Sequence, residues 1–383
     1  MIFRNVFFWM FSAVVLLTSC NNRQDDDNDI GVIDTIDNIQ DLNIDAWFTF
    51  ESILPLKAND SSLINFIGKV YIVPNGYVLW DNFEHNIFKY DKSGHCLWKI
   101  TNKGRGPGEF SRINDICLDA SEEYLYVLDG MDQGKVIKYE ITSGQYVTEH
   151  KIAFKAYAFY QFDHGGFAFA TGNNRIENVE HPNSQLALTD SSFRIVHTGI
   201  GFDDRWQGIS INNGSSYFFP IGKDSVLFTP QLPEIGDVYL LTPETINPYF
   251  RFENQNSDLI NKAKSISVSK VKEWLDDNLV EYNISEFWHQ ANKVHFYVTS
   301  NNSNREVLCD LSTGKCYSRP TNQHTDRHAY FAPKPVLGFK SNGLFVNVLP
   351  AFAIKDKQYE VIASLDTIEE NDNPVLVFYR INN

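Results

Sequence analysis

A recurring unit of short strands and tight turns constrains the fold of this chain more than any other feature. Its two clearest copies run from Ile67 to Ile100 and from Ile113 to Ile152. In each copy, apolar strands alternate with turns whose Gly, Asn or Asp residues tolerate left-handed backbone conformations. The segment Tyr77–Asp81 (YVLWD) of the first copy aligns with Leu125–Asp129 (LYVLD) of the second. Self-similarity at this spacing is typical of a β-propeller, in which each copy forms one blade.

Four fainter copies follow, beginning at Tyr157, Tyr217, Ile284 and Pro335, so we count six units over about 330 residues. We predict an all-β fold, a six-bladed β-propeller of four-stranded antiparallel blades. Between 257 and 282, apolar residues recur at helical spacing, which predicts a helical insertion there. Because an open ring would leave sheet edges unpaired, we expect the strand-like stretch 48–56 to pair with the last blade.

The first twenty residues read as an export signal. Arg4 supplies a positive charge, and residues 6–17 are apolar except for one serine, a length typical of a signal peptide and short for a membrane span. The order Leu17-Thr18-Ser19-Cys20 resembles the lipobox of bacterial lipoproteins. That resemblance implies that the signal, residues 1–19, is cut before Cys20, and that this cysteine is the lipid attachment through which the chain contacts a membrane.

An acidic stretch follows the cysteine. Residues 21–45 contain eight Asp and one Arg but no Lys or Glu, a net charge of −7 out of −15 for the chain. High charge with few aromatics predicts that residues 20–45 form a disordered tether, leaving 46–383 as the propeller. The acidic cluster resembles the surface-export signal of Bacteroidota lipoproteins. It implies an outer-membrane lipoprotein on the cell surface, with the periplasmic leaflet as the alternative.

Composition restricts the classes of partner and the metal chemistry. A net negative charge and a pI near 5.1 disfavour nucleic acid as a ligand, because nucleic-acid binding needs clustered Lys and Arg. The cysteines after Cys20 show no C-x-x-C spacing, so a zinc site is not expected. Cys309 and Cys316 flank a turn-like segment and could form a disulfide across a hairpin. Two buried free thiols are the alternative.

One segment carries a family resemblance. Residues 104–139 (GRGPGEFSRINDICLDASEEYLYVLDGMDQGKVIKY) resemble an NHL-type propeller repeat, and the matching residues are Gly104, Gly106, Gly108, Phe110, Asp119, Tyr126, Val127 and Asp129. More broadly, the chain is similar to functionally uncharacterised six-bladed β-propeller lipoproteins of gut Bacteroidota. This resemblance implies a fold and a location in the cell envelope. It implies no reaction.

The GRGPGEF loop has some features of a phosphate-binding loop and lacks others. The Lys-Ser/Thr pair of a Walker A motif is missing, and no helix follows whose N-terminus could hold an anion. Its glycines are better explained by a tight turn between blades. We therefore expect Arg105 and Glu109 to pair with each other or to face the mouth of the channel.

Two other loops contain residues of the kinds found in functional sites. His324 and His328 are four apart, the even spacing that puts two side chains on one face of a strand, but an exposed polar loop explains them better than a metal site. Trp206 follows a pair of adjacent aspartates and could stack on a sugar. Adjacent carboxylates seldom have the separation that glycoside hydrolysis needs.

No catalytic set emerges from these patterns, and no cofactor or metal is assigned. We predict a monomeric, membrane-anchored binding module that takes a glycan, a peptide or a partner protein, and that is more plausibly not an enzyme. The alternative is a propeller-type glycan hydrolase or lyase with its active site at the channel mouth.

Overall fold

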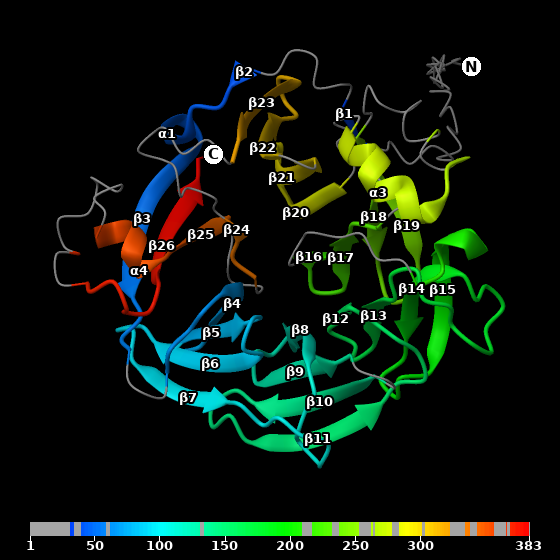
Figure 1. The fold of residues 1–383 in the computed structure, drawn as a ribbon, viewed down its shortest axis with the longest axis horizontal. Helices are drawn as coiled ribbons and strands as arrows, with labels where there is room; N and C mark the ends of the chain where they lie inside the picture. The colour runs from blue at the N-terminus through cyan, green and yellow to red at the C-terminus, as the bar shows by residue number, and fades with distance from the viewer. Residues whose placement is uncertain are drawn as a thin grey trace, which may run out of the picture.

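A computed structural model describes the chain over residues 31–33, 40–58, 62–130, 134–208, 217–231, 237–252, 262, 265–277, 283–300, 303–321, 334–337, 343–355, 365 and 368–382. Six β-sheets stand around a central channel, and in each of them the strands follow one another from the channel outward (Figure 1). The predicted six-bladed β-propeller is confirmed. The sheets are numbered as blades 1 to 6, in the chain order of their innermost strands.

The first three blades each have four antiparallel strands, which follow one another from the channel outward. Blade 1 consists of β4 (Ile67–Val73), β5 (Gly76–Asp81), β6 (Asn86–Asp91) and β7 (Cys96–Ile100). Blade 2 consists of β8 (Ile113–Leu118), β9 (Tyr124–Asp129), β10 (Lys135–Glu140) and β11 (Tyr146–Lys151). Blade 3 consists of β12 (Ala158–Gln161), β13 (Phe167–Ala170), β14 (Ser184–Thr189) and β15 (Ile195–Gly201).

The other three blades recruit strands from the N-terminal part of the chain. Blade 4 consists of β16 (Phe218–Gly222), β17 (Ser225–Phe228), β18 (Asp237–Leu241), β19 (Ile246–Phe252) and β1 (Gly31–Ile33). Blade 5 consists of β20 (Asn283–Gln290), β21 (Lys293–Ser300), β22 (Ser303–Asp310), β23 (Lys315–Pro320) and β2 (Gln40–Asp41). Blade 6 consists of β24 (Lys334–Pro335), β25 (Leu344–Leu349), β26 (Val375–Ile381) and β3 (Phe48–Pro55).

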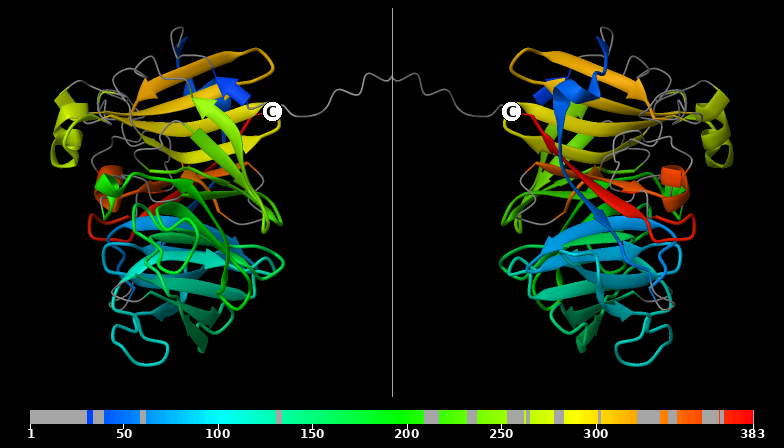
Figure 2. Two further views of the ribbon diagram at one scale, coloured as in Figure 1. Left: turned by 90° about the vertical axis from the view of Figure 1, so that its right-hand side faces the viewer. Right: turned by 90° about the vertical axis from the view of Figure 1, so that its left-hand side faces the viewer.

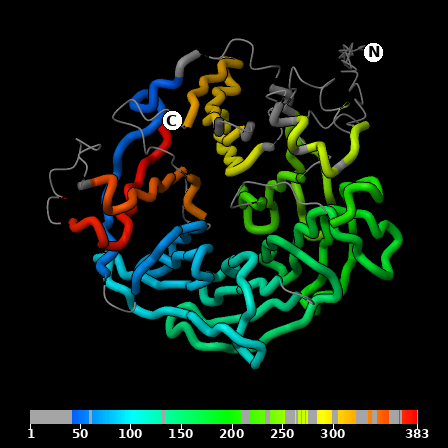
Figure 3. Tube along the Cα trace, in the orientation of Figure 1, coloured from blue at the N-terminus to red at the C-terminus, as the bar shows by residue number. Residues whose placement is uncertain are grey.

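Strand β3 closes the ring. It lies antiparallel to β26, with Pro55 opposite Val375 and Phe48 opposite Ile381, so strands from the two ends of the chain run side by side in blade 6 (Figure 3). The expectation that the stretch from residue 48 pairs with the last blade is confirmed. This pairing supplies hydrogen bonds to an edge of β26 that would otherwise be open.

Part of the segment expected to be a disordered tether is ordered strand. β1 runs parallel to β19, with Gly31 opposite Phe250, and β2 runs parallel to β23. The unpaired edge of each outermost strand offers the hydrogen-bonding groups that make this addition favourable. Helix α1 (Ile44–Trp47) then leads into β3 and buries Trp47 against the ring of Tyr317, 5.5 Å away. The propeller therefore includes residues that precede 46.

Both faces of a blade are buried, which is why the strands read as apolar runs. Val78 and Leu79 are adjacent in β5, both are 0% exposed, and they point to opposite faces of blade 1. Val78 belongs to the apolar cluster shared with blade 2. Leu79 belongs to the cluster shared with blade 6. Packing between neighbouring blades thus forms the core around the channel.

Helices lie at the periphery. α3 (Val268–Asp277) falls inside the helical insertion predicted for 257–282, and it buries Val271. α4 (Ala351–Lys355) follows β25. Both helices lie on the same side of the ring, and the C-terminal end of the described chain lies toward the opposite side (Figure 2). Within the described residues, none of the helices has the length and apolar character required to span a membrane.

Candidate functional site

A cavity of about 260 Å³ opens between blades 1 and 6; we call it the inter-blade cavity. Most of its lining is apolar, with a few charged and amide side chains. The described lining residues are Asn65, Phe66, Ile67, Gly68, Lys69, Val70, Glu286, Lys334, Pro335, Leu337, Val346, Asn347, Val348, Pro350 and Pro374. A concave, mostly apolar surface with a few polar groups is the usual form of a ligand site.

The charged side chains of the cavity occur in ion pairs. Lys69 on β4 places its Nζ 2.5 Å from Oδ1 of Asp115 on β8, and both side chains are almost fully buried. Lys334 on β24 lies 3.5 Å from Oε1 of Glu286 on β20. Each pair joins two different blades, so the charges hold neighbouring inner strands at fixed positions around the channel. Breaking a buried pair would leave an uncompensated charge.

Asp115 is the more deeply held of the two carboxylates. It accepts hydrogen bonds from the backbone N–H of Ile116 (2.8 Å) and of Phe159 (3.1 Å) in blade 3. Burial raises the pKa of this carboxyl, and the Lys69 ammonium together with these N–H groups opposes the rise. Asp115 therefore links three blades at the channel wall.

A second, smaller cavity of about 30 Å³ shares Lys69 and Leu337 with the inter-blade cavity. Leu337 lies against β4, where its N–H donates to the carbonyl of Val70 at 3.0 Å. Tyr160 lines the smaller cavity; its hydroxyl is buried and has no hydrogen-bond partner among the described residues. This space is about the size of one water molecule. The inter-blade cavity is the larger of the two.

Phe66, which lines the inter-blade cavity, and Phe83, on the neighbouring loop, are both exposed phenylalanines, and together we call them the rim. Their side chains are 54% and 71% exposed. Phe66 lines the cavity directly. Phe83 follows Asn82, whose N–H donates to the carbonyl of Phe66 at 3.1 Å and whose side chain packs on Gly68 of the cavity wall.

The buried carboxylate of Asp81, at the end of β5, holds the rim in place. Its Oδ1 accepts from the backbone N–H groups of Phe66 (3.3 Å), Phe83 (3.1 Å) and Glu84 (3.1 Å). Its Oδ2 accepts from the N–H of Asn65 at 2.8 Å. Four backbone donors from two loops thus converge on one carboxylate, which holds the two loops together.

The GRGPGEF loop lies elsewhere and has a structural role. Oε2 of Glu109 accepts from the N–H of Gly106 at 2.8 Å, inside the loop itself. Gly108 adopts a positive φ of 69°, and its N–H donates to Glu149 on β11 at 3.0 Å. Glu109 therefore pairs with its own loop rather than with Arg105, which is exposed. The loop packs on blade 2 and contributes no lining residue to the inter-blade cavity.

Trp206 is not the exposed stacking surface that the sequence suggested. It lies in the 3₁₀ turn η2 (Asp204–Trp206) and is 1% exposed. A tryptophan outside the strand repeats still occupies a buried position, because the turn folds its ring into the protein. His324, His328 and Cys20 lie outside the described residues. Among the described residues, no group of three or more potential metal ligands occurs.

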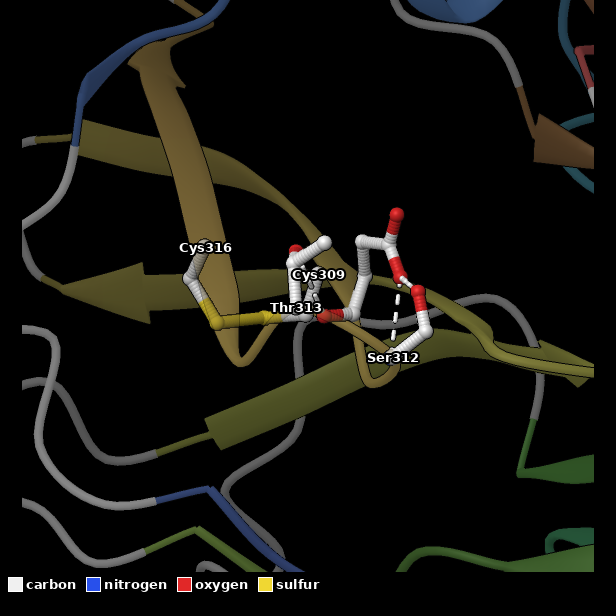
Figure 4. Close-up of a disulfide and its surroundings, with 5 residues drawn as sticks. Cys309, Ser312, Thr313 and Cys316 are labelled. Atoms are coloured by element: carbon white, nitrogen blue, oxygen red, sulfur yellow. Dashed lines mark hydrogen bonds between the residues drawn. A yellow bond between two sulfur atoms is a disulfide. The ribbon is translucent and has the colours of Figure 1, made fainter.

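Cys309 and Cys316 are joined by a disulfide (Figure 4). They face each other across the hairpin of β22 and β23. The turn between them is stabilised by Asp310, whose carboxylate accepts from the N–H of Ser312 at 2.9 Å. The bridge is on the outer part of blade 5 and lines no part of the inter-blade cavity.

The inter-blade cavity was not predicted from the sequence, because its described lining residues come from five separate stretches of the chain. One sequence signal could have indicated the rim. Asp81 and Asp129 occupy the same position in the repeat, yet their carboxylates accept hydrogen bonds from residues of different types. Asp129 accepts from the N–H groups of Ser111 and Arg112, where Asp81 holds Asn65 and Phe66.

The fold defines the chain as a six-bladed β-propeller, and the inter-blade cavity lies beside its inner strands. The chain belongs to the family described as domain of unknown function DUF4934, which matches residues 28–380. No curated protein is significantly similar to it in sequence.

Two solved structures resemble this fold. One, from Bacteroides fragilis NCTC 9343 and named only as a protein thought to be exported, has a TM-score of 0.74 at 21% identity, covering 90% of this chain and 98% of that one. The other, a member of the DUF4221 family from Bacteroides vulgatus ATCC 8482, has a TM-score of 0.51 at 9% identity, covering 88% and 98%. At these identities the likeness shows the fold alone.

Proposed function

We propose that this protein is an exported, lipid-anchored binding module that holds its ligand in the inter-blade cavity. The observation that carries this proposal is a largely apolar cavity that is lined by the exposed Phe66 and lies next to the loop of the exposed Phe83. Exposed apolar side chains beside a concave site are typical of an interaction surface. A glycan, a peptide or a partner protein could provide the ligand.

The N-terminal sequence supports the cellular location in this proposal. The apolar stretch before Cys20 and the lipobox-like order around it favour export and acylation. The Bacteroides fragilis structure, whose name also refers to export, agrees with that location. The acidic residues after Cys20 favour the outer face of the outer membrane, and the NHL-type resemblance fits an extracellular propeller.

The charged groups at the cavity favour binding over hydrolysis. Glu286 is the one carboxylate among the described lining residues, and it is paired with Lys334. Glycoside hydrolysis by the common mechanisms uses two carboxyl groups about 5–10 Å apart on either side of the substrate. A single paired carboxylate does not provide that arrangement.

A cavity-filling variant tests the proposal. Val348 is half-buried and lines the cavity, so Val348→Trp should fill it. Leu97→Trp is the matched control, because Leu97 is an exposed side chain on the outermost strand of blade 1. Purified protein is applied to a peptide array and a glycan array. We expect Leu97→Trp to bind the same peptides or glycans as the wild type, and Val348→Trp to bind none of them.

Two results would contradict the proposal. Retention of the same array members by Val348→Trp would place binding outside the inter-blade cavity. Failure of the wild type to retain any member of either array would remove the basis for a binding module of this kind.

A further inference from the structure

We infer that the ligand is a polypeptide, and that it inserts one apolar side chain into the inter-blade cavity beside Phe66, next to the loop that carries Phe83. This inference rests on the proposed function and adds the chemical class of the ligand. Four features of the molecule lead to it: the size of the cavity, its lining, the exposure of the rim and the comparison of blades 1 and 2.

The size of the cavity suits a single large side chain. Its volume of about 260 Å³ lies just below the range of about 300–1,000 Å³ that sites for drug-sized ligands occupy. One leucine or phenylalanine side chain with its flanking backbone fits such a space. An extended oligosaccharide would have most of its rings outside it.

The lining favours an apolar group. Ile67, Val70, Leu337, Val346 and Val348 form an aliphatic wall, and three prolines complete it: Pro335, Pro350 and Pro374. A buried sugar ring would need a hydrogen-bond partner for each hydroxyl, because an unsatisfied buried hydroxyl is destabilising. The two lysines that line the cavity are already paired with carboxylates. A side chain without polar atoms needs no such partners.

The rim is exposed but firmly held. Phe83, at 71% exposure, is the most exposed large apolar side chain of the described residues, and Phe66 is at 54%. Their loops are fixed by four hydrogen bonds to the buried Asp81 carboxylate. Aromatic side chains are enriched among the residues that dominate protein–protein binding energy, and a rigid loop loses little conformational entropy when a ligand covers it.

Blade 2 shows that the scaffold does not require a phenylalanine at this position. The N–H of Gly130 donates to the carbonyl of Arg112 at 3.3 Å, just as the N–H of Asn82 donates to that of Phe66. Arg112 therefore occupies the place of Phe66, and Asp129 the place of Asp81. A charged residue is tolerated there, so the turn itself does not require the apolar residue that blade 1 places beside the cavity.

Small amides and small glycosides separate the two classes of ligand. We would titrate the purified protein with N-acetyl-L-leucinamide, N-acetyl-L-phenylalaninamide, methyl β-D-glucopyranoside and methyl α-D-mannopyranoside, using saturation-transfer NMR. The variants are the double substitution Phe66→Ser/Phe83→Ser and the control Leu97→Ser. Leu97 is a suitable control because its side chain is 53% exposed, close to the 54% of Phe66, and it lies on the outermost strand of the same blade.

We expect both amides to bind with saturation and the glycosides not to bind. The double substitution should raise the dissociation constant of the amides at least about fivefold, and Leu97→Ser should leave it within about twofold. Because all three side chains are exposed, circular dichroism should show the same fold in each variant.

The failures of the inference and of the proposed function are distinguishable. If the glycosides bind, the amides do not, and Val348→Trp abolishes glycoside binding, the binding site stands and the polypeptide inference is wrong. If the amides bind equally well to the double variant, the rim has no role and the inference is also wrong. If neither class binds, both the inference and the proposed function are contradicted.

Discussion

The carboxylate of Asp81 connects the stability of blade 1 to the geometry of the proposed site, and Asp81→Asn tests that connection. The substitution keeps the size of the side chain and replaces one acceptor oxygen by an amide donor. Oδ1 serves three N–H groups and Oδ2 serves that of Asn65. The asparagine should therefore direct its oxygen to the three donors and its NH₂ toward Asn65.

That orientation sets the expected cost. The hydrogen bond from the N–H of Asn65 is lost, and this buried donor then faces the NH₂ group of the new asparagine. The three hydrogen bonds to the remaining oxygen are kept, but their acceptor no longer carries a charge. Hydrogen bonds to charged groups contribute about 1.5–3 kcal/mol each, and a buried unsatisfied donor costs about 1–3 kcal/mol. We expect Asp81→Asn to lower the free energy of unfolding by about 2–4 kcal/mol. Urea denaturation followed by tryptophan fluorescence measures this change.

Asp129→Asn is the matched control. Asp129 accepts from the N–H and the hydroxyl of Ser111 and from the N–H of Arg112, in the equivalent loop of blade 2. We expect a comparable loss of stability, but only Asp81→Asn should also weaken binding of N-acetyl-L-leucinamide. A change of less than about 0.5 kcal/mol in Asp81→Asn would refute the reasoning about the carboxylate. Equal weakening of binding by both variants would refute its link to the rim.

Three further predictions concern other parts of the chain. Lys69→Met leaves Asp115 buried without its cation, so the pKa of that carboxyl should rise further. A carboxyl whose pKa is higher in the folded state than in the unfolded state destabilises the fold once it ionises, so the loss of stability should be small near pH 5 and grow as pH rises toward 8. Urea denaturation at the two pH values measures this difference. A loss of stability that does not depend on pH would contradict the prediction. Reduction of the disulfide between Cys309 and Cys316 should lower the free energy of unfolding by about 2 kcal/mol, measured by denaturation with and without dithiothreitol; an unchanged midpoint would contradict this. Cys20→Ala should abolish incorporation of labelled palmitate and move the protein from the membrane to the soluble fraction, and continued labelling would show that another residue is acylated.

The repeated part of the fold could be predicted because its signals are local. Apolar strands and turn residues recur in blades 1 and 2, and the pairing of the stretch from Phe48 with the last blade follows from the need to close the ring. The strands β1 and β2 could not be predicted in this way. They lie in a highly acidic segment, and only the open edges of blades 4 and 5 make them favourable.

The site could not be predicted because it depends on contacts between distant segments. Lys69 and Asp115 come from neighbouring blades, and Glu286 meets Lys334 across another boundary. Sequence motifs drew attention instead to Glu109, whose carboxylate stabilises its own loop, and to Trp206, which is buried. In both cases the unusual residues stabilise the local fold.

The central claim is that a ligand occupies the inter-blade cavity, and methyl NMR of isoleucine-labelled protein tests it most directly. Ile67 lines the cavity, whereas Ile137 is buried between blades 1 and 2 and lines no part of it. On titration with N-acetyl-L-leucinamide, we predict that the Ile67 methyl resonance shifts to saturation while that of Ile137 stays in place. A saturating shift elsewhere with Ile67 unmoved would contradict the account.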